Sequence, residues 1–465
     1  MLPKLTLSYW LTLHGLVTVV AVLAYVVAAH VRQQRRQPAA AIAWILFILL
    51  LPYVALPAFL TFGSRKRERP PSKLAPGPSV PHRGSDRWAV ETIEALAQPA
   101  PASYHALNLH EDGSAARDAL LATIEQAQRS IDLSTFILSN DDFGRNIVDR
   151  LTQKAQAGVR VRVLLDGLGR FMGGRPSMRA FVRASGDFAL FVPPLSSPLK
   201  GRTNLRNHRK LVVADAGHPE ARLWCGGRNI AAEYFNGSQR KAAWRDLTID
   251  LRGPLVEQAA ALFEHDWQFA HGKSDKTRRA EPSASAPLDG AQMIASGPDQ
   301  VDDTIYSLLV TAAYRARRHI ALTTPYFVPE SALLMALCLA ARRGLTVDLL
   351  LPARSNHRLS DFARGRALRA LAQAGGRIWL APGMLHAKLV VIDDTLALAG
   401  SANLDSRSLF LNYEVMIAFH KAGDIERFAH WFEHNRASAR PYVAHAPGLA
   451  RDVAEGMLLW LGFQL

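Results

Sequence analysis

Cysteine is nearly absent from this sequence of 465 residues. Only Cys225 and Cys338 occur, far apart and outside any Cys-x-x-Cys spacing. Neither a disulfide framework nor a cysteine zinc site is therefore indicated, and a reducing compartment suits such a chain. The histidines outside the two motifs described below also lack a spacing typical of metal ligands. We therefore expect no metal ion and no other cofactor.

The sequence also lacks the short motifs of nucleotide binding and of serine hydrolases. It contains no Gly-x4-Gly-Lys-Ser/Thr, Gly-x-Gly-x2-Gly or Gly-x-Ser-x-Gly run. The loops that hold nucleotide phosphates and the strained turn that presents a nucleophilic serine depend on these glycines. Nucleotide-dependent chemistry and serine hydrolysis therefore have no support.

Acidic residues are too few to balance the basic ones. The chain has 55 Lys and Arg against 40 Asp and Glu, a net charge of +15, and a pI near 10.1. Such an excess predicts an anionic partner, which is either a nucleic acid or an acidic membrane surface. Charge alone does not decide between them.

Two long runs near the N-terminus contain no charged residue, residues 5–29 and residues 39–62. Each is long enough to cross a hydrocarbon core of about 30 Å at 1.5 Å per helical residue. We therefore expect two transmembrane helices within residues 1–63, the second kinked or shortened at Pro52 and Pro57. A cleaved signal peptide is the main alternative for the first run, but the run exceeds the usual apolar region and a second follows at once.

Basic residues are fewer between the two runs than outside them. Residues 30–36 hold three arginines, whereas Lys4 and residues 64–73 together hold six positive charges. By the positive-inside rule the N-terminus and everything after residue 64 face the cytoplasm. We expect a multi-pass protein of the cytoplasmic membrane with a cytoplasmic catalytic region, and a membrane rather than a nucleic acid as its anionic partner.

Segments rich in proline, serine and charge divide the remaining chain. Residues 64–110 are expected to form a tether, and residues 272–290 a linker. On either side of the linker the pattern is strand, helix with a glycine stop, then strand, which is typical of a βαβ unit. We expect the α/β class, with two similar α/β/α sandwich halves at residues 111–271 and 291–465 and the active site where they meet.

One motif occurs twice, as NHRKLVVAD and as LHAKLVVID. In each copy a histidine and a lysine stand two apart before an apolar run, so the strand period places both side chains on one face. A face with an imidazole and an ammonium group suits a phosphate ester, because the histidine can attack phosphorus while the lysine neutralises the oxygens. Two copies supply a nucleophile and an acid. The residues are His208, Lys210, His386 and Lys388.

Each motif ends in an aspartate, Asp215 in the first copy and Asp393 in the second. The aspartate follows the lysine by an odd number of residues, so it cannot share that face of a regular strand. The residues after it are typical of a turn. We expect each aspartate to close its strand and to brace the site.

The residues after the two motifs also repeat. The first copy is followed by Gly227 and Asn229, and the second by Gly400, Ser401 and Asn403. Small residues at a strand end let backbone and amide N–H groups approach a phosphoryl oxygen. We expect both asparagines and Ser401 to support a bound phosphate.

Each half also offers one carboxylate further along the chain, Asp246 in the first and Glu414 in the second. A carboxylate against the far imidazole nitrogen fixes the tautomer and supports the positive charge that develops during attack. We expect Asp246 to brace His208 and Glu414 to brace His386.

The doubled pattern resembles the phospholipase D superfamily, whose signature is His-x-Lys-x4-Asp followed by a Gly-Ser-x-Asn element. Gly227 departs from it, because it stands where that superfamily has serine. Within the superfamily the chain resembles the bacterial cardiolipin synthases along nearly its whole length, from AIAWILFILLLPYVALPAFLTFG to GSANLDSRSLFLNYE. The resemblance implies that the three residues of each motif form the catalytic set, Asp215 and Asp393 included.

The resemblance further implies an enzyme of the bacterial inner membrane that transfers a phosphatidyl group from one phosphatidylglycerol to another and releases glycerol, without metal or nucleotide. The residues alone indicate phosphodiester chemistry at a membrane. They leave open which histidine is the nucleophile, which alcohol accepts, and the oligomeric state. A lipid-hydrolysing phospholipase D, a membrane-tethered nuclease and a non-catalytic lipid-binding scaffold remain as alternatives.

Overall fold

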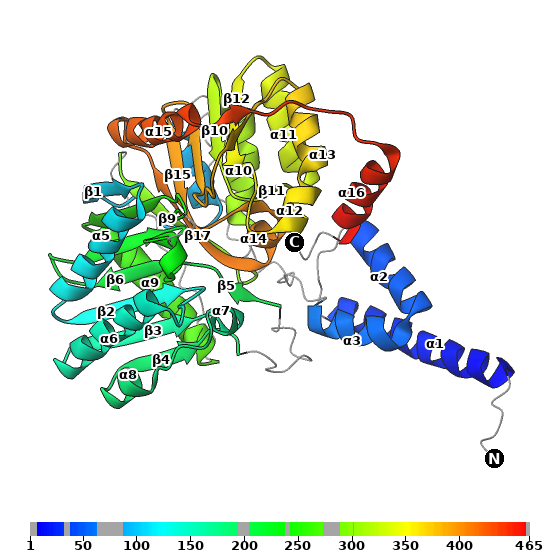
Figure 1. Ribbon diagram of the computed structural model, residues 1–465, viewed down its shortest axis with the longest axis horizontal. Coiled ribbons are helices and arrows are strands. Elements are labelled where there is room, and N and C mark those ends of the chain that lie inside the picture. The colour runs from blue at the N-terminus through cyan, green and yellow to red at the C-terminus, as the bar shows by residue number, and fades with distance from the viewer. Residues whose placement is uncertain are drawn as a thin grey trace.

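The structure is a computed structural model, and Figure 1 shows its two halves side by side, the first in cyan and green and the second in yellow and orange. The N-terminal helices lie to one side of these halves. The structure describes residues 7–31, 38–62, 87–193, 204–237, 242–272, 289–300 and 302–461.

The first half is built on a seven-stranded sheet with the order β1-β8-β7-β6-β2-β3-β4. Strands β2, β3 and β4 run parallel, and the others pair antiparallel. The parallel strands are joined through helices, as the βαβ pattern in the sequence predicted. The strands are β1 (His105–His110), β2 (Ser130–Thr135), β3 (Arg160–Leu165), β4 (Asp187–Leu190), β6 (Leu211–Ala214), β7 (Arg222–Gly226) and β8 (Thr248–Arg252).

The second half repeats this topology. Its strands follow the order β18-β13-β12-β10-β14-β15-β17, with β9 on the other side of β17. Thus β9 takes the place of β1, β17 that of β8, and β14 that of β6, while β18 is an addition at the edge. The strands are β9 (Ala291–Ser296), β10 (His319–Thr323), β12 (Thr346–Pro352), β13 (Arg377–Ala381), β14 (Leu389–Ile392), β15 (Leu396–Gly400), β17 (Asn412–Phe419) and β18 (Arg440–Pro441).

One helix from each half lies between the two sheets, α9 (Leu255–Ala270) after β8 and α15 (Ala422–Ala437) after β17. Both helices and both sheets contribute to one continuous apolar core, and each large side chain buried there contributes about 1.5–3 kcal/mol. The two halves are therefore held together by a shared hydrophobic core. The side chains from these helices include Leu255, Val256, Phe263, Phe428, Trp431 and Phe432.

The remaining helices cover the outer faces and the edges of the sheets, except for the last helix of the second half, which packs on other helices and not on a sheet. In the first half they are α5 (Gly113–Gln126), α6 (Asp142–Gln156), α7 (Gly167–Met172), α8 (Arg179–Arg183) and the 3-10 turn η2 (Ala232–Tyr234). In the second half they are α10 (Thr304–Arg315), α11 (Ser331–Arg342), α12 (Arg358–Ala363), α13 (Gly365–Gln373), α14 (Ser406–Phe410) and α16 (Leu449–Leu461). Two short strands, β11 (Phe327–Val328) and β16 (Leu404–Asp405), pair with each other.

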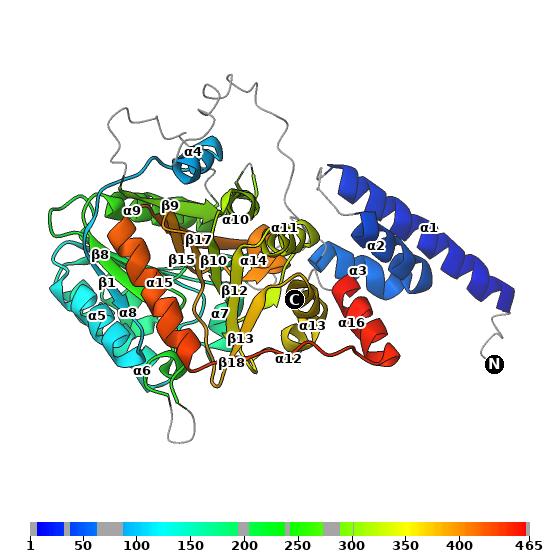
Figure 2. The same ribbon diagram turned by 90° about the horizontal axis from the view of Figure 1, so that it is seen from above.

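The end of the expected tether belongs to the folded halves. Helix α4 (Trp88–Ala95) packs on α10 (Figure 2), and Trp88 and Ile93 are buried in the core of the second half. Strand β1 pairs with β8 at the edge of the first sheet. The boundary at residue 110 was therefore placed too late, because the proline-rich composition continues into a segment that packs.

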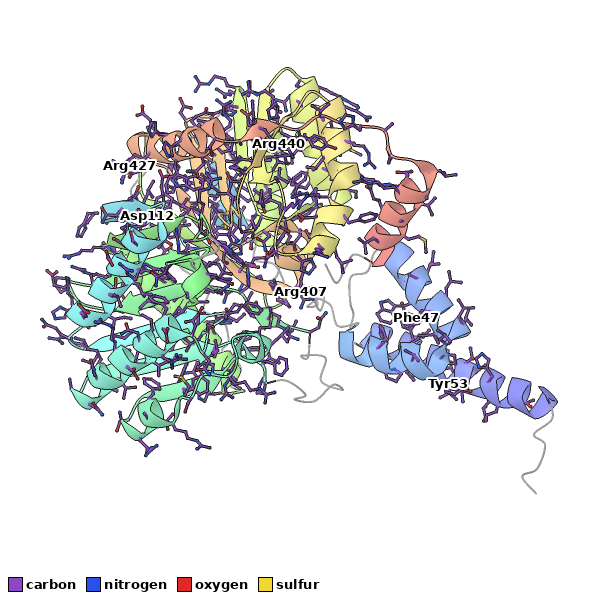
Figure 3. All side chains as sticks on the ribbon, in the orientation of Figure 1. Phe47, Tyr53, Asp112, Arg407, Arg427 and Arg440 are labelled. Atoms are coloured by element: carbon purple, nitrogen blue, oxygen red, sulfur yellow. The ribbon has the colours of Figure 1, made fainter. Side chains whose placement is uncertain are left out.

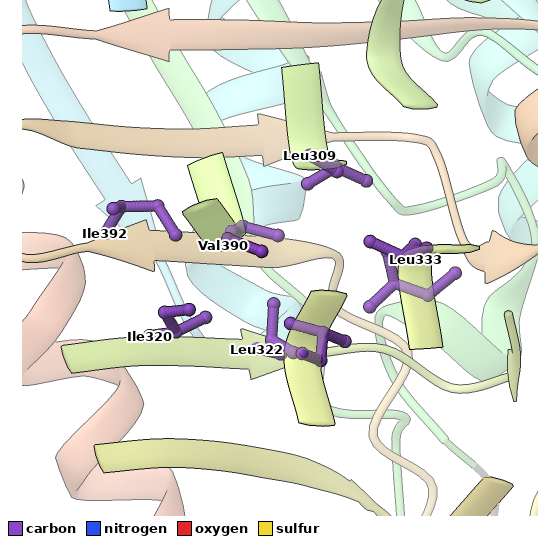
Figure 4. A pocket seen from close by; sticks show the side chains of 9 residues that line it. Leu309, Ile320, Leu322, Leu333, Val390 and Ile392 are labelled. Atoms are coloured by element: carbon purple, nitrogen blue, oxygen red, sulfur yellow. The ribbon is translucent and has the colours of Figure 1, made fainter. Parts of the chain in front are cut away.

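The core of the second half contains a small apolar cavity of about 10 Å³ lined by side chains of β10, β14, α10 and α11, several of which Figure 4 labels. Leu309, Leu322, Leu333 and Val390 are among its lining residues. A volume of this size holds at most one water, and the walls offer no polar partner for it. It is a packing gap and not a binding site for a lipid.

The N-terminal segment forms α1 (Leu7–Val31), α2 (Pro38–Leu50) and α3 (Pro52–Phe62). The second expected span is therefore two helices, because proline lacks an N–H and disfavours helical geometry at the residue before it, here Leu51. Tyr25 and Phe59 are buried against each other, with ring centroids 4.7 Å apart. Over the residues whose side chains are described, no helix is both long and apolar enough to cross a bilayer.

Candidate active site

Each motif histidine is joined to the opposite half by its own backbone. Strand β5 (Arg206–Asn207) pairs in parallel with the start of β17, and the N–H of His208 donates to the carbonyl of Tyr413 at 2.9 Å. In the same way the N–H of His386 donates to the carbonyl of Arg245 at 2.7 Å. The residue after each acceptor is a carboxylate, so this pairing sets one carboxylate beside each histidine.

The carboxylates cross between the halves. Nδ1 of His208 lies 2.9 Å from Oε2 of Glu414, and Nδ1 of His386 lies 2.8 Å from Oδ2 of Asp246. We had expected each carboxylate to brace the histidine of its own half, and that assignment is wrong. Each carboxylate stands two residues before the strand position that pairs with the glycine ending β7 or β15. The two carboxylates therefore occupy equivalent positions in the two halves.

The two motif lysines are buried beside the histidines. Nζ of Lys210 donates to the carbonyl of His208 at 2.7 Å, and Nζ of Lys388 lies 2.8 Å from Nδ1 of His386. The charge of Lys388 also acts on His208 and on Lys210, which places the groups of both motifs in one cluster. The structure thus brings the two histidines, two lysines and two crossed carboxylates together at the interface of the halves.

Burial and the lysine charges hold both imidazoles neutral. Burial, followed by the positive charge of Lys210, lowers the pKa of His208 to about 4 even though Glu414 opposes the shift. Burial and Lys388 lower the pKa of His386 to about 3. A neutral imidazole carries the lone pair that a nucleophile or a general base needs.

The carboxylates remain ionised and the lysines are weakened. Burial favours the neutral acid, but His386 and Lys388 outweigh it and lower the pKa of Asp246 to about 2. The same balance, with His208 as the main partner, lowers the pKa of Glu414. Burial lowers the pKa of Lys388 to about 8. A bound phosphate would place a further negative charge beside Lys210 and Lys388 and would favour their protonated forms.

Ser401 and Gly227 occupy equivalent places but act differently. The hydroxyl of Ser401 donates to Oε2 of Glu414 at 2.6 Å, which fixes the carboxylate that braces His208. At Gly227 a Cβ atom would come within 2.4 Å and 2.7 Å of the two carboxylate oxygens of Asp246. The glycine therefore leaves room for the shorter carboxylate, and the absence of a serine at that position is part of the geometry.

The two asparagines are hydrogen-bonded to neighbouring groups of the first and second half, respectively. Asn229 accepts from the N–H of Ile137 and donates to the hydroxyl of Tyr234 at 2.8 Å. Asn403 donates to the hydroxyl of Ser408, and its Oδ1 is buried without a hydrogen-bond partner among the described residues. Their expected support of a phosphate stays a prediction.

Asp215 and Asp393 close their strands as expected, but at the end away from the histidines. Asp215 accepts the N–H groups of Arg129 and Ser130 at 2.7 and 2.9 Å, and Asp393 makes the equivalent bonds before β10. The four residues of β6 span about 13 Å, so the structure does not bring these aspartates into the cluster. They anchor the start of the neighbouring strand.

Aromatic side chains that the sequence analysis did not single out surround the histidines. The rings of Tyr234 and Trp244 lie 5.2 and 5.6 Å from the ring of His386, and Phe136 lies 5.2 Å from His208. Tyr234 and Trp244 stand between the first motif and Asp246, so a count of aromatic residues near that carboxylate would have found them.

Two arginines at the junction of the halves also escaped prediction. Arg407, labelled in Figure 3, donates to the carbonyl and the side-chain oxygen of Asn204 across the junction. Burial and the nearby charge of Arg206 lower the pKa of the Arg407 guanidinium, and Nε of Arg206 is buried without a hydrogen-bond partner among the described residues. The two adjacent guanidiniums repel each other, and the carboxylate of Asp166 offsets part of the positive charge at both.

The doubled α/β sheet and its paired histidine–carboxylate sites define an enzyme of the phospholipase D type. Within this class, the family described as cardiolipin synthase, phospholipase D-like domain, matches residues 120–267 and 309–436, more than half of the chain. The chain belongs to this family. A second family, described as phospholipase D-nuclease N-terminal, matches residues 19–64.

Curated relatives are similar in sequence over most of the chain. It is 31% identical to cardiolipin synthase A of Pseudomonas putida strain W619 over 87% of this chain and 87% of that protein. It is 30% identical to cardiolipin synthase 1 of Bacillus cereus over 86% of this chain and 83% of that protein.

Solved structures share the fold at low identity. A crystal structure of phosphatidylserine synthase from Haemophilus influenzae matches with a TM-score of 0.62 and 12% identity, over 81% of this chain and all of that one. Polyphosphate kinase from Porphyromonas gingivalis matches with a TM-score of 0.50 over 76% of this chain and 52% of that one, also at 12% identity. At this identity the likeness concerns the fold alone.

Proposed function

We propose that this protein is a phosphatidyltransferase that makes cardiolipin from two molecules of phosphatidylglycerol and releases glycerol. The observation that carries the proposal is the crossed arrangement, in which Glu414 and Asp246 each occupy Nδ1 of a histidine from the other half. Nε2 is then the reacting nitrogen of both rings, as two-step transfer to and from phosphorus requires. Membership of the cardiolipin synthase family supports this choice of substrate.

In the first step Nε2 of one histidine attacks the phosphorus of a phosphatidylglycerol. The bond from phosphorus to the glycerol headgroup breaks, and the other histidine, protonated on Nε2, gives its proton to the departing oxygen. The products are free glycerol and a phosphatidyl-histidine. The phosphate charge offsets the lysine charges that lower the histidine pKa values, so substrate binding favours protonation of the acid histidine.

In the second step the terminal hydroxyl of another phosphatidylglycerol gives its proton to that second histidine. The oxygen attacks phosphorus, the phosphorus–nitrogen bond breaks, and cardiolipin leaves the regenerated neutral imidazole. Lys210 and Lys388 neutralise the phosphoryl oxygens in both steps. Asp246 and Glu414 stabilise the positive charge on the histidines.

We place the N-terminal helices in the bacterial cytoplasmic membrane, with the two halves on the cytoplasmic side. The two uncharged runs support this placement, as does the N-terminal family match over residues 19–64. An anchored enzyme would stay next to a substrate that does not leave the bilayer.

The test uses the full-length protein in vesicles of phosphatidylcholine and phosphatidylglycerol, the latter labelled in its headgroup glycerol. We expect one labelled glycerol released for each cardiolipin formed, as measured by mass spectrometry. Phosphatidic acid as the main lipid product would instead establish hydrolysis. Release of nucleotides from DNA, with no change in the lipid, would establish the tethered nuclease.

Variants connect the product to the cluster. His208→Ala and His386→Ala should each lower turnover by about 10²–10⁴, the usual contribution of an acid–base partner. His430→Ala is the matched control, because His430 lies exposed on α15. Cardiolipin formation that survives both motif variants would rule out the proposed chemistry.

A further inference from the structure

The exposed apolar side chains of the first half gather on one segment. In the described part of that half, the large hydrophobic residues that are exposed are Leu168, Phe171, Met172 and Val182, and Phe171 and Met172 are 58% and 60% exposed. All four lie on α7, on α8 or beside them. Scattered exposed apolar residues are ordinary, but a cluster on one element marks an interaction surface.

Helices α7 and α8 and the loop between them carry positive charge only, and the next carboxylate is the exposed Asp187 at the start of β4. Residues 167–186 contain four arginines and no carboxylate. Within the described residues, none of these arginines forms an ion pair, although Arg175 lies over the ring of Phe171 at 4.7 Å. A mixture of unpaired arginines with exposed aromatic and aliphatic side chains is typical of protein surfaces that bind anionic lipid headgroups. The four are Arg170, Arg175, Arg179 and Arg183.

An open groove of about 520 Å³ runs along this segment, between α7, α8 and β4. Three of the arginines and three apolar side chains line it, and Nε of Arg170 is buried without a hydrogen-bond partner in the described part of the chain. Such a lining matches a phosphate beside the first carbons of an acyl chain. The apolar lining residues are Met178, Val182 and Phe188.

This segment is held firmly at the edge of the active site. Asp166 caps α7 by accepting the N–H groups of Leu168 and Gly169 through one oxygen. Its other oxygen accepts the N–H of Asn207, the residue before His208. Figure 1 shows α7 beside β5 where the halves meet.

We propose that α7 and α8, with the loop between them, form a bilayer-docking surface, which we name the α7–α8 face, and that it lies on the anionic headgroups of the membrane. Leu168, Phe171 and Met172 enter the interface, while the four arginines contact lipid phosphates. The proposal rests on the proposed lipid substrate. Docking through this face brings the reacting histidines within reach of a phosphate that stays in the bilayer. An N-terminal anchor alone would leave the orientation of the catalytic halves free.

The first test measures depth in the membrane and needs no turnover. A nitroxide is attached to Met172→Cys in the full-length chain carrying Cys338→Ala, because Cys225 is buried and unreactive. Collision with oxygen and with a polar relaxation agent is compared in vesicles with and without phosphatidylglycerol. A nitroxide at Arg129→Cys, on an exposed turn, is the matched control.

We expect the probe at position 172 to lie in the headgroup region of anionic vesicles and the probe at position 129 to lie in water. A probe at position 172 that stays in water in both vesicles would overturn the proposal. Spin–spin broadening between labelled copies would also overturn it, because the face would then be an interface between two copies of the chain.

The second test changes the arginines. Arg179→Gln with Arg183→Gln should raise the KM for phosphatidylglycerol in vesicles about tenfold or more, since each basic residue near an anionic surface contributes about 1 kcal/mol. The rate on lipid dispersed in neutral detergent should stay within about twofold. Arg129→Gln with Arg440→Gln, two exposed arginines elsewhere, should change neither value. Equal losses on vesicles and in detergent would show a role in catalysis and not in docking.

The two proposals fail separately. A wild-type protein that makes no cardiolipin would remove the proposed function while leaving the depth measurement intact. A wild-type protein that makes cardiolipin with position 172 in water would remove only the α7–α8 face.

Discussion

Oε2 of Glu414 lies 2.9 Å from Nδ1 of His208, although the two residues belong to different halves of the protein. Asp246 and His386 repeat this relationship in the opposite direction. Each half therefore contributes one histidine and the carboxylate that serves the other histidine. Neither half by itself contains a complete histidine–carboxylate pair, which gives a physical reason for two fused copies of one fold.

The crossed pairs predict how the carboxylates act. Glu414→Gln should lower kcat by about 10²–10⁴, because the amide no longer fixes the tautomer or stabilises a positive His208. Glu414 is also the charge that raises the pKa of His208, so the variant should shift the acidic limb of the profile of kcat/KM against pH to lower pH. Glu433→Gln is the control, because it makes the same substitution at a glutamate on α15, outside the cluster. A variant at position 414 with the full rate and an unchanged profile would disprove the brace.

The buried lysines predict an alkaline limit to activity. Burial lowers the pKa of Lys388 to about 8 and that of Lys210 well below its usual value, so the ammonium charge is lost as the pH rises through this region. In the free enzyme kcat/KM should fall above about pH 8. The pKa read from this fall is a macroscopic pKa of the two coupled lysines and not of either lysine alone. Lys388→Arg should move this limb to higher pH, because a guanidinium stays protonated. Lys421→Arg, on the exposed surface, should leave it in place.

Exchanging glycine and serine at positions 227 and 401 should lower kcat by unequal amounts. Gly227→Ser places a Cβ within 2.4 Å of a carboxylate oxygen of Asp246, which must move away from His386. A displacement of this size should lower kcat by about 10²-fold. Ser401→Gly removes one hydrogen bond to Glu414 and should cost only about 3- to 10-fold. Steady-state kinetics of the two variants, with thermal unfolding as the check on folding, decide the point.

Asp215 predicts a change in stability and not in chemistry. Asp215→Ala removes the acceptor of three backbone N–H groups at the start of β2, those of residues 128, 129 and 130, and places alanine at a φ of 53°. The free energy of unfolding should fall by about 1–3 kcal/mol, while kcat of the folded protein at low temperature stays within about threefold. A loss of kcat as large as that of His208→Ala would assign this aspartate to the reaction, as the family resemblance implied.

Metal removal should leave the rate unchanged. Nucleophilic attack by histidine with charge neutralisation by two lysines needs no Lewis acid. The measurement is turnover in vesicles after dialysis against EDTA, compared with dialysis against buffer alone. Inhibition by EDTA that a divalent cation restores would contradict the proposed mechanism.

Local patterns in the sequence were sufficient for several strands and helices and for the grouping of the motif side chains. The strand, helix, glycine and strand order predicted β2, α6 and β3, and again β10, α11 and β12, because burial on a sheet and on a helix leaves different periods. The two His-x-Lys runs predicted that each lysine lies beside its histidine, because residues two apart in an extended chain face the same way. The turn expected at Asp215 is present, with a positive φ of 53°.

The tertiary structure decided which groups meet. The crossing of Glu414 and Asp246 depends on backbone pairing between segments about 140 to 206 residues apart in the chain, and no local period encodes such a partner. The place of β1 at a sheet edge and of α4 on the second half likewise depends on surfaces that exist only after the halves fold. The net charge of +15 predicted an anionic partner without naming it, whereas the packing of α7 beside β5 (Figure 1), which no local pattern encodes, sets where the proposed α7–α8 face lies relative to the histidines.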